Sequence, residues 1–307
     1  MTIWVGSKKV CLHTAFIITA LLLNFSLTSC LYIAENPASI QPQPPEKAKA
    51  DSAKNQTGAI KEKHLVPDDC KQLLLMITPN WNSPRGVLWR YERDDANQPW
   101  RLVGTLMEGV VGRKGLAWGN GLYDIPDLRE PSDGPRKKEG DGKAPAGAFL
   151  LGSVFGSAPP EQMGALKMPY LYASESTICI DDSKSQYYNR IIDQTVVEKP
   201  DWRSFEHMRR SDELYRLGVI VEYNRKPNDP GKGSCVFIHI ERNPTTGTAG
   251  CTAFAKPNVE ILVQWLDEKK TPVLVQLPHP EYLRLRKNWL LPDIPDAGVT
   301  NQKGHPK

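Results

Sequence analysis

Residues 234–254 read SCVFIHIERNPTTGTAGCTAF and decide how this chain is interpreted. The first part has the apolar, β-branched character of a strand, in which alternate side chains share a face, so Phe237 and His239 are expected on one side of a sheet. Residues 242–247 contain proline and glycine and predict a turn. The chain then returns beside the strand, and we expect Cys251 to come within hydrogen-bond reach of His239.

The spacing of this histidine and cysteine suggests nucleophilic chemistry. A thiol attacks efficiently only as the thiolate, and a neighbouring imidazole commonly lowers its pKa. The glycine before Cys251 permits a sharp turn, and the backbone N–H groups of Gly250 and Ala249 are then suited to stabilise an oxyanion. The alternative, a buried cysteine near a packed histidine, is favoured when the two residues are taken alone. CxxC and HExxH do not occur in the sequence, so metal binding is a weaker alternative still.

Most of the remaining folded part also has the character of strands. The 26 prolines and 23 glycines imply many turns and little long helix. We expect a mainly β domain with a few short helices (α+β). Strands are predicted over residues 72–78, 86–93, 100–111, 233–241 and 271–277. Helices are predicted within 201–217 and after Pro257, where the apolar face comprises Val259, Leu262, Val263 and Leu266.

Three segments in a fixed order resemble the YkuD-like L,D-transpeptidases. IHI followed by TAGC is similar to the family's strand histidine and its [ST]-H-G-C motif. Upstream, residues 137–152 (KKEGDGKAPAGAFLLG) are similar to the family's TP[TA]GxF segment, and residues 168–170 match its MPY-like segment. The three matches together are more specific than any one of them.

The resemblance implies a β-sandwich catalytic domain and a two-step acyl transfer. Cys251 would attack a peptidoglycan tetrapeptide stem at the carbonyl of its third residue and release the terminal D-Ala, with His239 as base and acid. An amine of another stem would then resolve the thioester into a cross-link. Thr248 and Tyr170 would contact the substrate. No metal or organic cofactor is implied.

The sequence also departs from the family's pattern. Ala249 replaces the motif's histidine, and Ala253 stands where arginine or asparagine is usual. The interval from histidine to cysteine is short, and residues 174–232 have the character of an insertion. Two other functions therefore stay open: an L,D-carboxypeptidase or cross-link hydrolase that uses the same thiol, and a wall-binding lipoprotein without catalysis.

The N-terminus has the features of an export signal. Residues 1–29 contain a short basic region and an apolar run that is too short to span a bilayer comfortably. They end just before the cysteine of the sequence LTSC, residues 27–30. LTSC resembles a lipobox, which implies cleavage before Cys30 and acylation of that cysteine. Leu31 follows, without the aspartate of inner-membrane retention. We expect a periplasmic protein that is lipid-anchored, more in keeping with the outer membrane than with the inner one.

Composition divides the rest of the chain. Residues 30–66 are rich in Pro, Gln, Lys and Ala and predict a flexible tether, residues 67–291 form the catalytic domain, and residues 292–307 predict a loose tail. The net charge of +4 is too small and dispersed for a nucleic-acid-binding surface. The expected partners are peptidoglycan stem peptides and a membrane reached through the lipid anchor, and not nucleic acid.

The other reactive and charged residues give weaker signals. If Cys30 is lipidated and Cys251 is a free thiol, one disulfide can form among the three other cysteines of the exported chain, and the sequence does not choose the pair. These three are Cys70, Cys179 and Cys235. His207, on a predicted helix, is expected to be a solvated or packing residue and not a catalytic one, and Lys137 is expected on a solvated loop.

Overall fold

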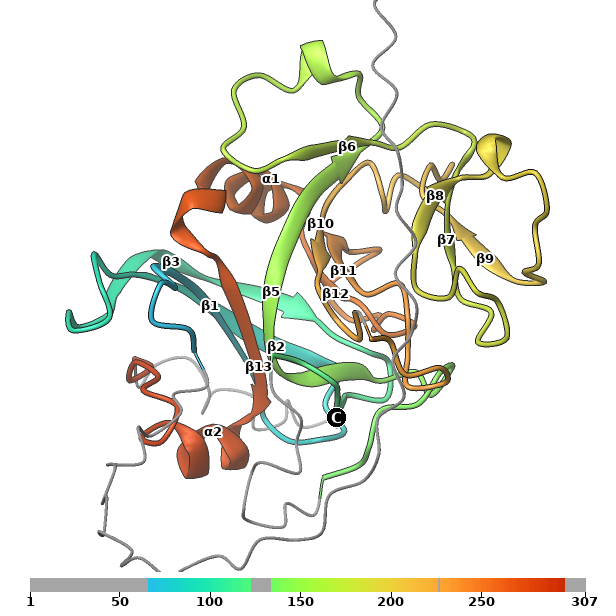
Figure 1. Cartoon of the computed structure of the whole chain (residues 1–307). Helices are drawn as coiled ribbons and strands as arrows, with labels where there is room; N and C mark the ends of the chain where they lie inside the picture. Colours follow the sequence, from blue (N-terminus) through green and yellow to red (C-terminus); the bar gives the residue numbers. More distant parts are fainter. Residues whose placement is uncertain (1–65, 123–133, 226, 296–307) are drawn as a thin grey trace, which may run out of the picture. The chain divides into compact units, whose positions relative to one another are not determined.

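The computed structural model describes residues 66–122, 134–225 and 227–295 (Figure 1). The predicted signal peptide, the lipidation site Cys30 and the tether up to residue 65 lie outside these ranges, as do tail residues 296–307. All described residues belong to one unit of the chain, Ile60–Lys307. Within the described ranges, no helix has the length and apolar character needed to cross a membrane.

Strands dominate the described structure, as expected from the sequence. In chain order they are β1 Gln72–Thr78, β2 Arg85–Glu92, β3 Arg101–Val110, β4 Leu116–Trp118, β5 Ala144–Gly156, β6 Tyr170–Tyr172, β7 Thr177–Ile180, β8 Ile191–Asp193, β9 Phe205–His207, β10 Leu217–Val221, β11 Phe237–Ile240, β12 Thr252–Phe254 and β13 Val273–Pro278. The α-helices are α1 Lys256–Trp265 and α2 His279–Leu285, and short 3-10 helices lie at Pro160–Gln162, Gln194–Val196 and Glu268–Lys270. The expectation of a mainly β domain with a few short helices is confirmed.

The large sheet closes on itself instead of forming the two facing sheets of a sandwich. Its strand order is β10-β11-β12-β3-β2-β1-β13-β5-β4, and β10 also pairs with β5. The closure depends on the length of β5, the long curved strand in Figure 1. Residues 147–150 of β5 pair with β13, and residues 151–156 pair with β10. One strand thus joins the two sides of the sheet, and this pairing is the physical reason why the sandwich expectation differs from the observed arrangement.

The core forms around the most apolar strand. Every residue of β1 is buried, and β1 pairs with β2 on one side and with β13 on the other. A central strand covered on both faces favours such a continuous apolar run. Helix α1 starts with Pro257 near its N-terminus, and its predicted apolar face is buried. The helix prediction after Pro257 is therefore confirmed.

The helices predicted within residues 201–217 are wrong. This segment contains β9, which pairs with β7 in a separate three-stranded sheet of order β8-β7-β9, and it ends where β10 begins. The Asp201 carboxylate accepts hydrogen bonds from the Ser185 hydroxyl (2.5 Å) and the Gln186 amide (3.0 Å), which hold the segment in an extended path. Pairing with distant residues has outweighed the helical spacing of the local apolar residues.

The segment interpreted as an insertion, residues 174–232, provides part of the main sheet. It supplies the small sheet and also β10, the strand that closes the large sheet. His207 lies on β9 and not on a helix, and it is exposed as expected.

The C-terminal region is more ordered than the sequence predicts. Helix α2, which was not predicted, begins at His279. The Tyr282 hydroxyl donates to the Pro292 carbonyl (2.9 Å), and the Tyr91 hydroxyl donates to the Asp293 carbonyl (3.0 Å). The described start of the predicted loose tail, residues 292–295, is therefore held against the folded body.

Candidate active site

Two adjacent parallel strands bring the histidine and the cysteine into one region. Strands β11 and β12 pair with His239 opposite Ala253, and Cys251 immediately precedes β12. The Phe237 backbone N–H points to Cys251 Sγ at 3.4 Å. Phe237 and Cys251 share a small buried cluster, whereas Ile238 packs into the large core. The predicted alternation along the strand is confirmed.

His239 is a buried, neutral base. Its side chain is 5% exposed, and Nδ1 lies 2.8 Å from the carbonyl oxygen of Ile240. A carbonyl only accepts, so Nδ1 carries the proton and Nε2 is left with the lone pair. Burial lowers the pKa of His239 to about 4. At neutral pH the imidazole is uncharged and can accept a proton at Nε2.

Cys251 is a buried, neutral thiol. It is 6% exposed, and its S–H donates to the Cys235 carbonyl at 3.5 Å. Burial raises the pKa of Cys251 to about 12, and the charge of Glu206 adds to this effect, while the Phe237 amide and the Tyr215 hydroxyl lower it. No hydrogen bond joins Cys251 to His239 within the described residues. The expected lowering of the Cys251 pKa by the imidazole is therefore not seen: burial raises this pKa, and His239 is not among the groups that shift it.

The turn before Cys251 is held by Thr248. Its hydroxyl donates to the Cys251 carbonyl (2.6 Å) and accepts from the Gly250 N–H (3.1 Å). Its own N–H donates to the Val111 carbonyl (2.9 Å). Thr248, predicted as a substrate contact, thus shapes the loop that carries the cysteine. An oxyanion would have to compete with Thr248 for the Gly250 N–H, while Ala249 is exposed beside it.

A buried polar chain fixes the residues that follow the cysteine. The Thr252 hydroxyl donates to the Gln276 amide oxygen (2.7 Å), and the Gln276 amide nitrogen donates to the Pro145 carbonyl (2.8 Å). Ala253 is fully buried opposite His239. The small side chain at this departure from the family's pattern suits its position, because a buried charge or amide would need partners there.

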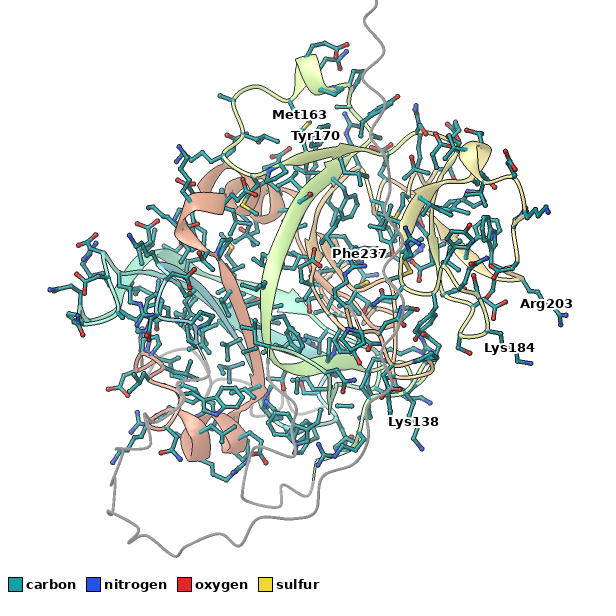
Figure 2. All side chains as sticks on the ribbon, in the orientation of Figure 1. Lys138, Met163, Tyr170, Lys184, Arg203 and Phe237 are labelled. Atoms are coloured by element: carbon teal, nitrogen blue, oxygen red, sulfur yellow. A yellow bond between two sulfur atoms is a disulfide. The ribbon has the colours of Figure 1, made fainter. Side chains whose placement is uncertain are left out.

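Tyr170 is not brought to the cysteine. Its hydroxyl donates to the Ala158 carbonyl (2.6 Å), and its ring packs against the large core, whereas Cys251 belongs to the small cluster. Figure 2 shows Tyr170, on β6, apart from Phe237 on β11. Tyr170 thus packs within the fold, and its contact with a substrate stays a prediction.

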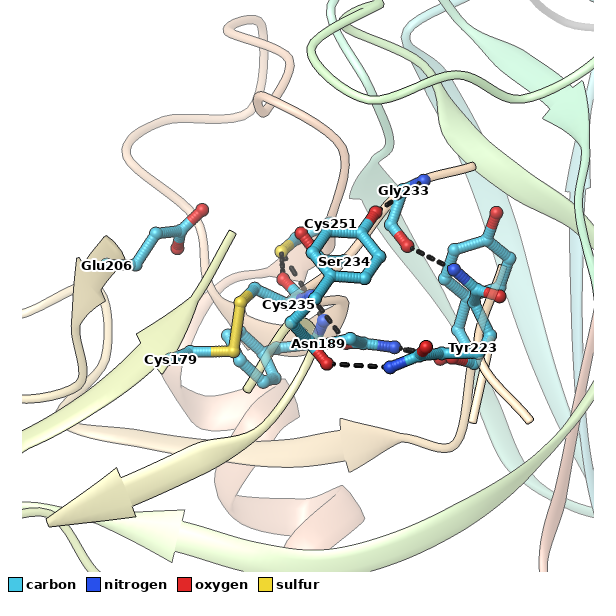
Figure 3. Close-up of a disulfide and its surroundings, with 12 residues drawn as sticks. Cys179, Asn189, Glu206, Tyr223, Gly233, Ser234, Cys235 and Cys251 are labelled. Carbon is cyan, nitrogen blue, oxygen red and sulfur yellow. Dashed lines mark hydrogen bonds between the residues drawn. A yellow bond between two sulfur atoms is a disulfide. The ribbon is translucent and has the colours of Figure 1, made fainter. Parts of the chain in front are cut away.

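A disulfide joins the small sheet to the site. Cys179 on β7 is bonded to Cys235, close to Cys251 (Figure 3). Among the described cysteines, Cys70 and Cys251 are free and buried. Cys235 has a left-handed backbone (φ 51°), and its N–H donates to the side-chain oxygen of Asn189 at 3.0 Å. The disulfide and Asn189 together hold the carbonyl that accepts the Cys251 S–H.

Three further residues near the cysteine were not predicted as site residues. The Tyr215 ring lies 5.1 Å from the His239 ring, and its hydroxyl donates to Glu206 at 2.7 Å. Lys137, expected on a solvated loop, is buried in an ion pair with Asp141 at 2.7 Å and lowers the pKa of Cys251. Tyr215 and Glu206 come from the segment interpreted as an insertion, and no local pattern relates them to the motif.

In the described parts of the chain, no group of three or more potential ligands suits a metal ion.

Comparison with known proteins yields one weak structural similarity. No family model matches the chain, and no curated protein matches it. A solved structure, the helical cell shape determining protein Pgp2 from Campylobacter jejuni, is similar with a TM-score of 0.34 and 16% identity. The match covers 71% of this chain and 51% of that one, so the chain spans about half the length of Pgp2. A TM-score of 0.34 is too low to establish a shared fold.

Proposed function

We propose that the chain is a cysteine acyltransferase of the L,D-transpeptidase kind that acts on peptidoglycan stem peptides. The observation that carries the proposal is the position of a free thiol, Cys251, just before β12, the strand that pairs with β11 and its histidine, whose Nε2 can accept a proton. The motif order over residues 137–251 supports the choice of substrate.

In the first step, the proton of the Cys251 thiol passes to His239 Nε2 as sulfur attacks the carbonyl carbon of the third stem residue. The tetrahedral oxyanion collapses, the C–N bond to the terminal D-Ala breaks, and His239 returns the proton to the departing amine. In the second step an acceptor amine attacks the thioester and His239 accepts its proton, which then restores the thiol. The chemistry is balanced without a cofactor.

The burial of Cys251 supports the alternative of a wall-binding protein without catalysis. A thiol that is 6% exposed, with a pKa of about 12, is almost entirely protonated at neutral pH. Under the proposed function, substrate must reach the sulfur and the proton must leave during attack. The two proposals therefore differ in whether a covalent intermediate forms at this sulfur.

Replacing Cys251 by alanine is expected to abolish a covalent adduct with a carbapenem and to abolish turnover of tetrapeptide muropeptides. Intact mass reports the adduct, and product masses with and without an added amine acceptor distinguish transfer from hydrolysis. Cys70→Ala is the matched control, because Cys70 is the other buried free thiol of the described residues. An adduct on wild-type protein that persists in Cys251→Ala would refute this assignment.

We also propose that the chain is anchored in the periplasm through acylated Cys30, on the basis of the LTSC sequence. Cys30→Ser is expected to lose incorporation of labelled fatty acid and partitioning into detergent. Cys251→Ser serves as the control for loss of a cysteine. Unchanged labelling of the Cys30 variant would exclude the anchor.

A further inference from the structure

Tyr215 packs against His239 and belongs to the buried cluster that contains Cys251. Its ring is 5.1 Å from the His239 ring and 5.6 Å from the ring of Phe237, whose amide points at Cys251 Sγ. Tyr215 and Cys251 are members of the same buried cluster, and Tyr215 is 6% exposed. The phenol thus borders both residues of the candidate catalytic pair.

The hydroxyl of Tyr215 is engaged by a carboxyl group of the small sheet. It lies 2.7 Å from Glu206 Oε2. Glu206 on β9 is paired with Cys179 on β7, and Cys179 is bonded to Cys235, whose carbonyl accepts the Cys251 S–H. Figure 3 shows the Glu206 carboxyl group on the same side of the disulfide as Cys251. The small sheet therefore reaches the thiol both through the disulfide and through Tyr215.

A phenol has a single proton, so the charge of Glu206 decides where Tyr215 donates it. An ionised carboxylate accepts that proton in the 2.7 Å hydrogen bond. A protonated carboxyl group can instead donate to the phenol oxygen, and the phenol O–H is then free to donate to sulfur.

Several charged groups influence the protonation of Glu206. Burial raises the pKa of Glu206, and the acidic neighbours Asp181 and Glu139 raise it further. Tyr215 and Arg210 lower it, and the Arg210 guanidinium lies 5.1 Å from the centre of the Tyr215 ring. The environment thus favours the protonated form of Glu206 to a greater extent than solvent does.

We propose that Tyr215 is a catalytic residue that donates a hydrogen bond to the Cys251 thiolate, and that Glu206 is a positioning residue whose protonated carboxyl group directs that hydrogen bond to sulfur. The role in turnover rests on the proposed function. The thiol proton passes to His239 Nε2, the thiolate accepts the Tyr215 O–H without proton transfer, and Glu206 keeps its proton. Ionisation of Glu206 withdraws the donor and adds a negative charge near sulfur.

Two variants are expected to change the reactivity of Cys251 in opposite directions. Tyr215→Phe keeps the ring but removes the donor, and alkylation of Cys251 by iodoacetamide at pH 7 should be about 10- to 100-fold slower. Glu206→Gln keeps a donor to the phenol oxygen and cannot ionise, so alkylation should be faster than in wild type at each pH where the wild-type carboxyl group is ionised. The full chain is labelled across a range of pH, and the Cys251 peptide is quantified by mass.

A second tyrosine provides the matched control. The Tyr91 hydroxyl donates to the Asp293 carbonyl at 3.0 Å, Tyr91 belongs to the large core and not to the cluster of Cys251, and Tyr91→Phe should leave the alkylation profile of Cys251 unchanged. If Glu206→Gln and Tyr215→Phe slow labelling alike, or if Tyr215→Phe has no effect, the proposal is overturned. Because labelling needs no substrate, opposite shifts in a protein without turnover would support the hydrogen-bond network and refute only the proposed function.

Discussion

His239→Ala is expected to lower turnover of tetrapeptide muropeptides by about 10²- to 10⁴-fold, the usual contribution of a general base. The thiol is protonated at neutral pH, so its proton must leave during attack. His239 is placed to accept it, because the Ile240 carbonyl fixes the proton on Nδ1 and leaves Nε2 free. Steady-state rates, determined from product masses, would measure the loss.

Two other variants separate loss of the base from loss of packing. His239→Gln retains more of the buried volume than alanine and should lose as much activity, since an amide is not a base at neutral pH. Ala249→His adds an imidazole on an exposed turn and should leave Cys251 labelling unchanged. Turnover of His239→Gln close to that of wild type would exclude His239 as the base.

The same histidine also links stability to pH. The pKa of His239 is about 4 in the folded chain and near 6.5 when unfolded, so the unfolded state binds the additional proton. The contribution of the neutral imidazole to the free energy of unfolding is fully present above pH 6.5 and is lost as pH falls through 4. This loss is at most about 3 kcal/mol. His239→Gln should lack this part of the acid dependence in urea unfolding, whereas His207→Gln, at an exposed histidine, should keep it.

Loss of the Cys179–Cys235 disulfide is expected to have the largest effect on stability. The bond closes a segment with a sequence separation of 56, and the loop-entropy relation gives about 4 kcal/mol for a loop of that length. Unfolding in urea without reductant would compare wild type with the double variant Cys179→Ala, Cys235→Ala. The same variant should alter alkylation of Cys251, because Cys235 holds the carbonyl that accepts its S–H.

Reduction provides the internal control for this prediction. Wild type in reductant should unfold at the same urea concentration as the double variant, and Cys70→Ala, which removes a buried thiol outside the disulfide, should keep most of the wild-type stability. A reduced wild type with the stability of the oxidised protein would show that the bond contributes little to folding.

The sequence by itself determined the elements that local patterns encode. The apolar run over 72–78 predicted β1, and the proline start with its apolar face predicted α1. Period-two alternation placed Phe237 and His239 on one face of β11, where both rings pack against Tyr215. These predictions succeeded because each depends on neighbours within a few residues along the chain, where strand and helix periodicity operate.

Only the tertiary structure decided how distant segments meet. Closure of the sheet depends on β5 pairing with both β13 and β10, and the disulfide partner of Cys235 depends on the small sheet. The protonation of the candidate pair was decided in the same way, since burial and the carboxyl group of Glu206 come from segments remote from TAGC. Desolvation and long-range pairing are properties of the assembled fold, and no pattern within residues 234–254 encodes them.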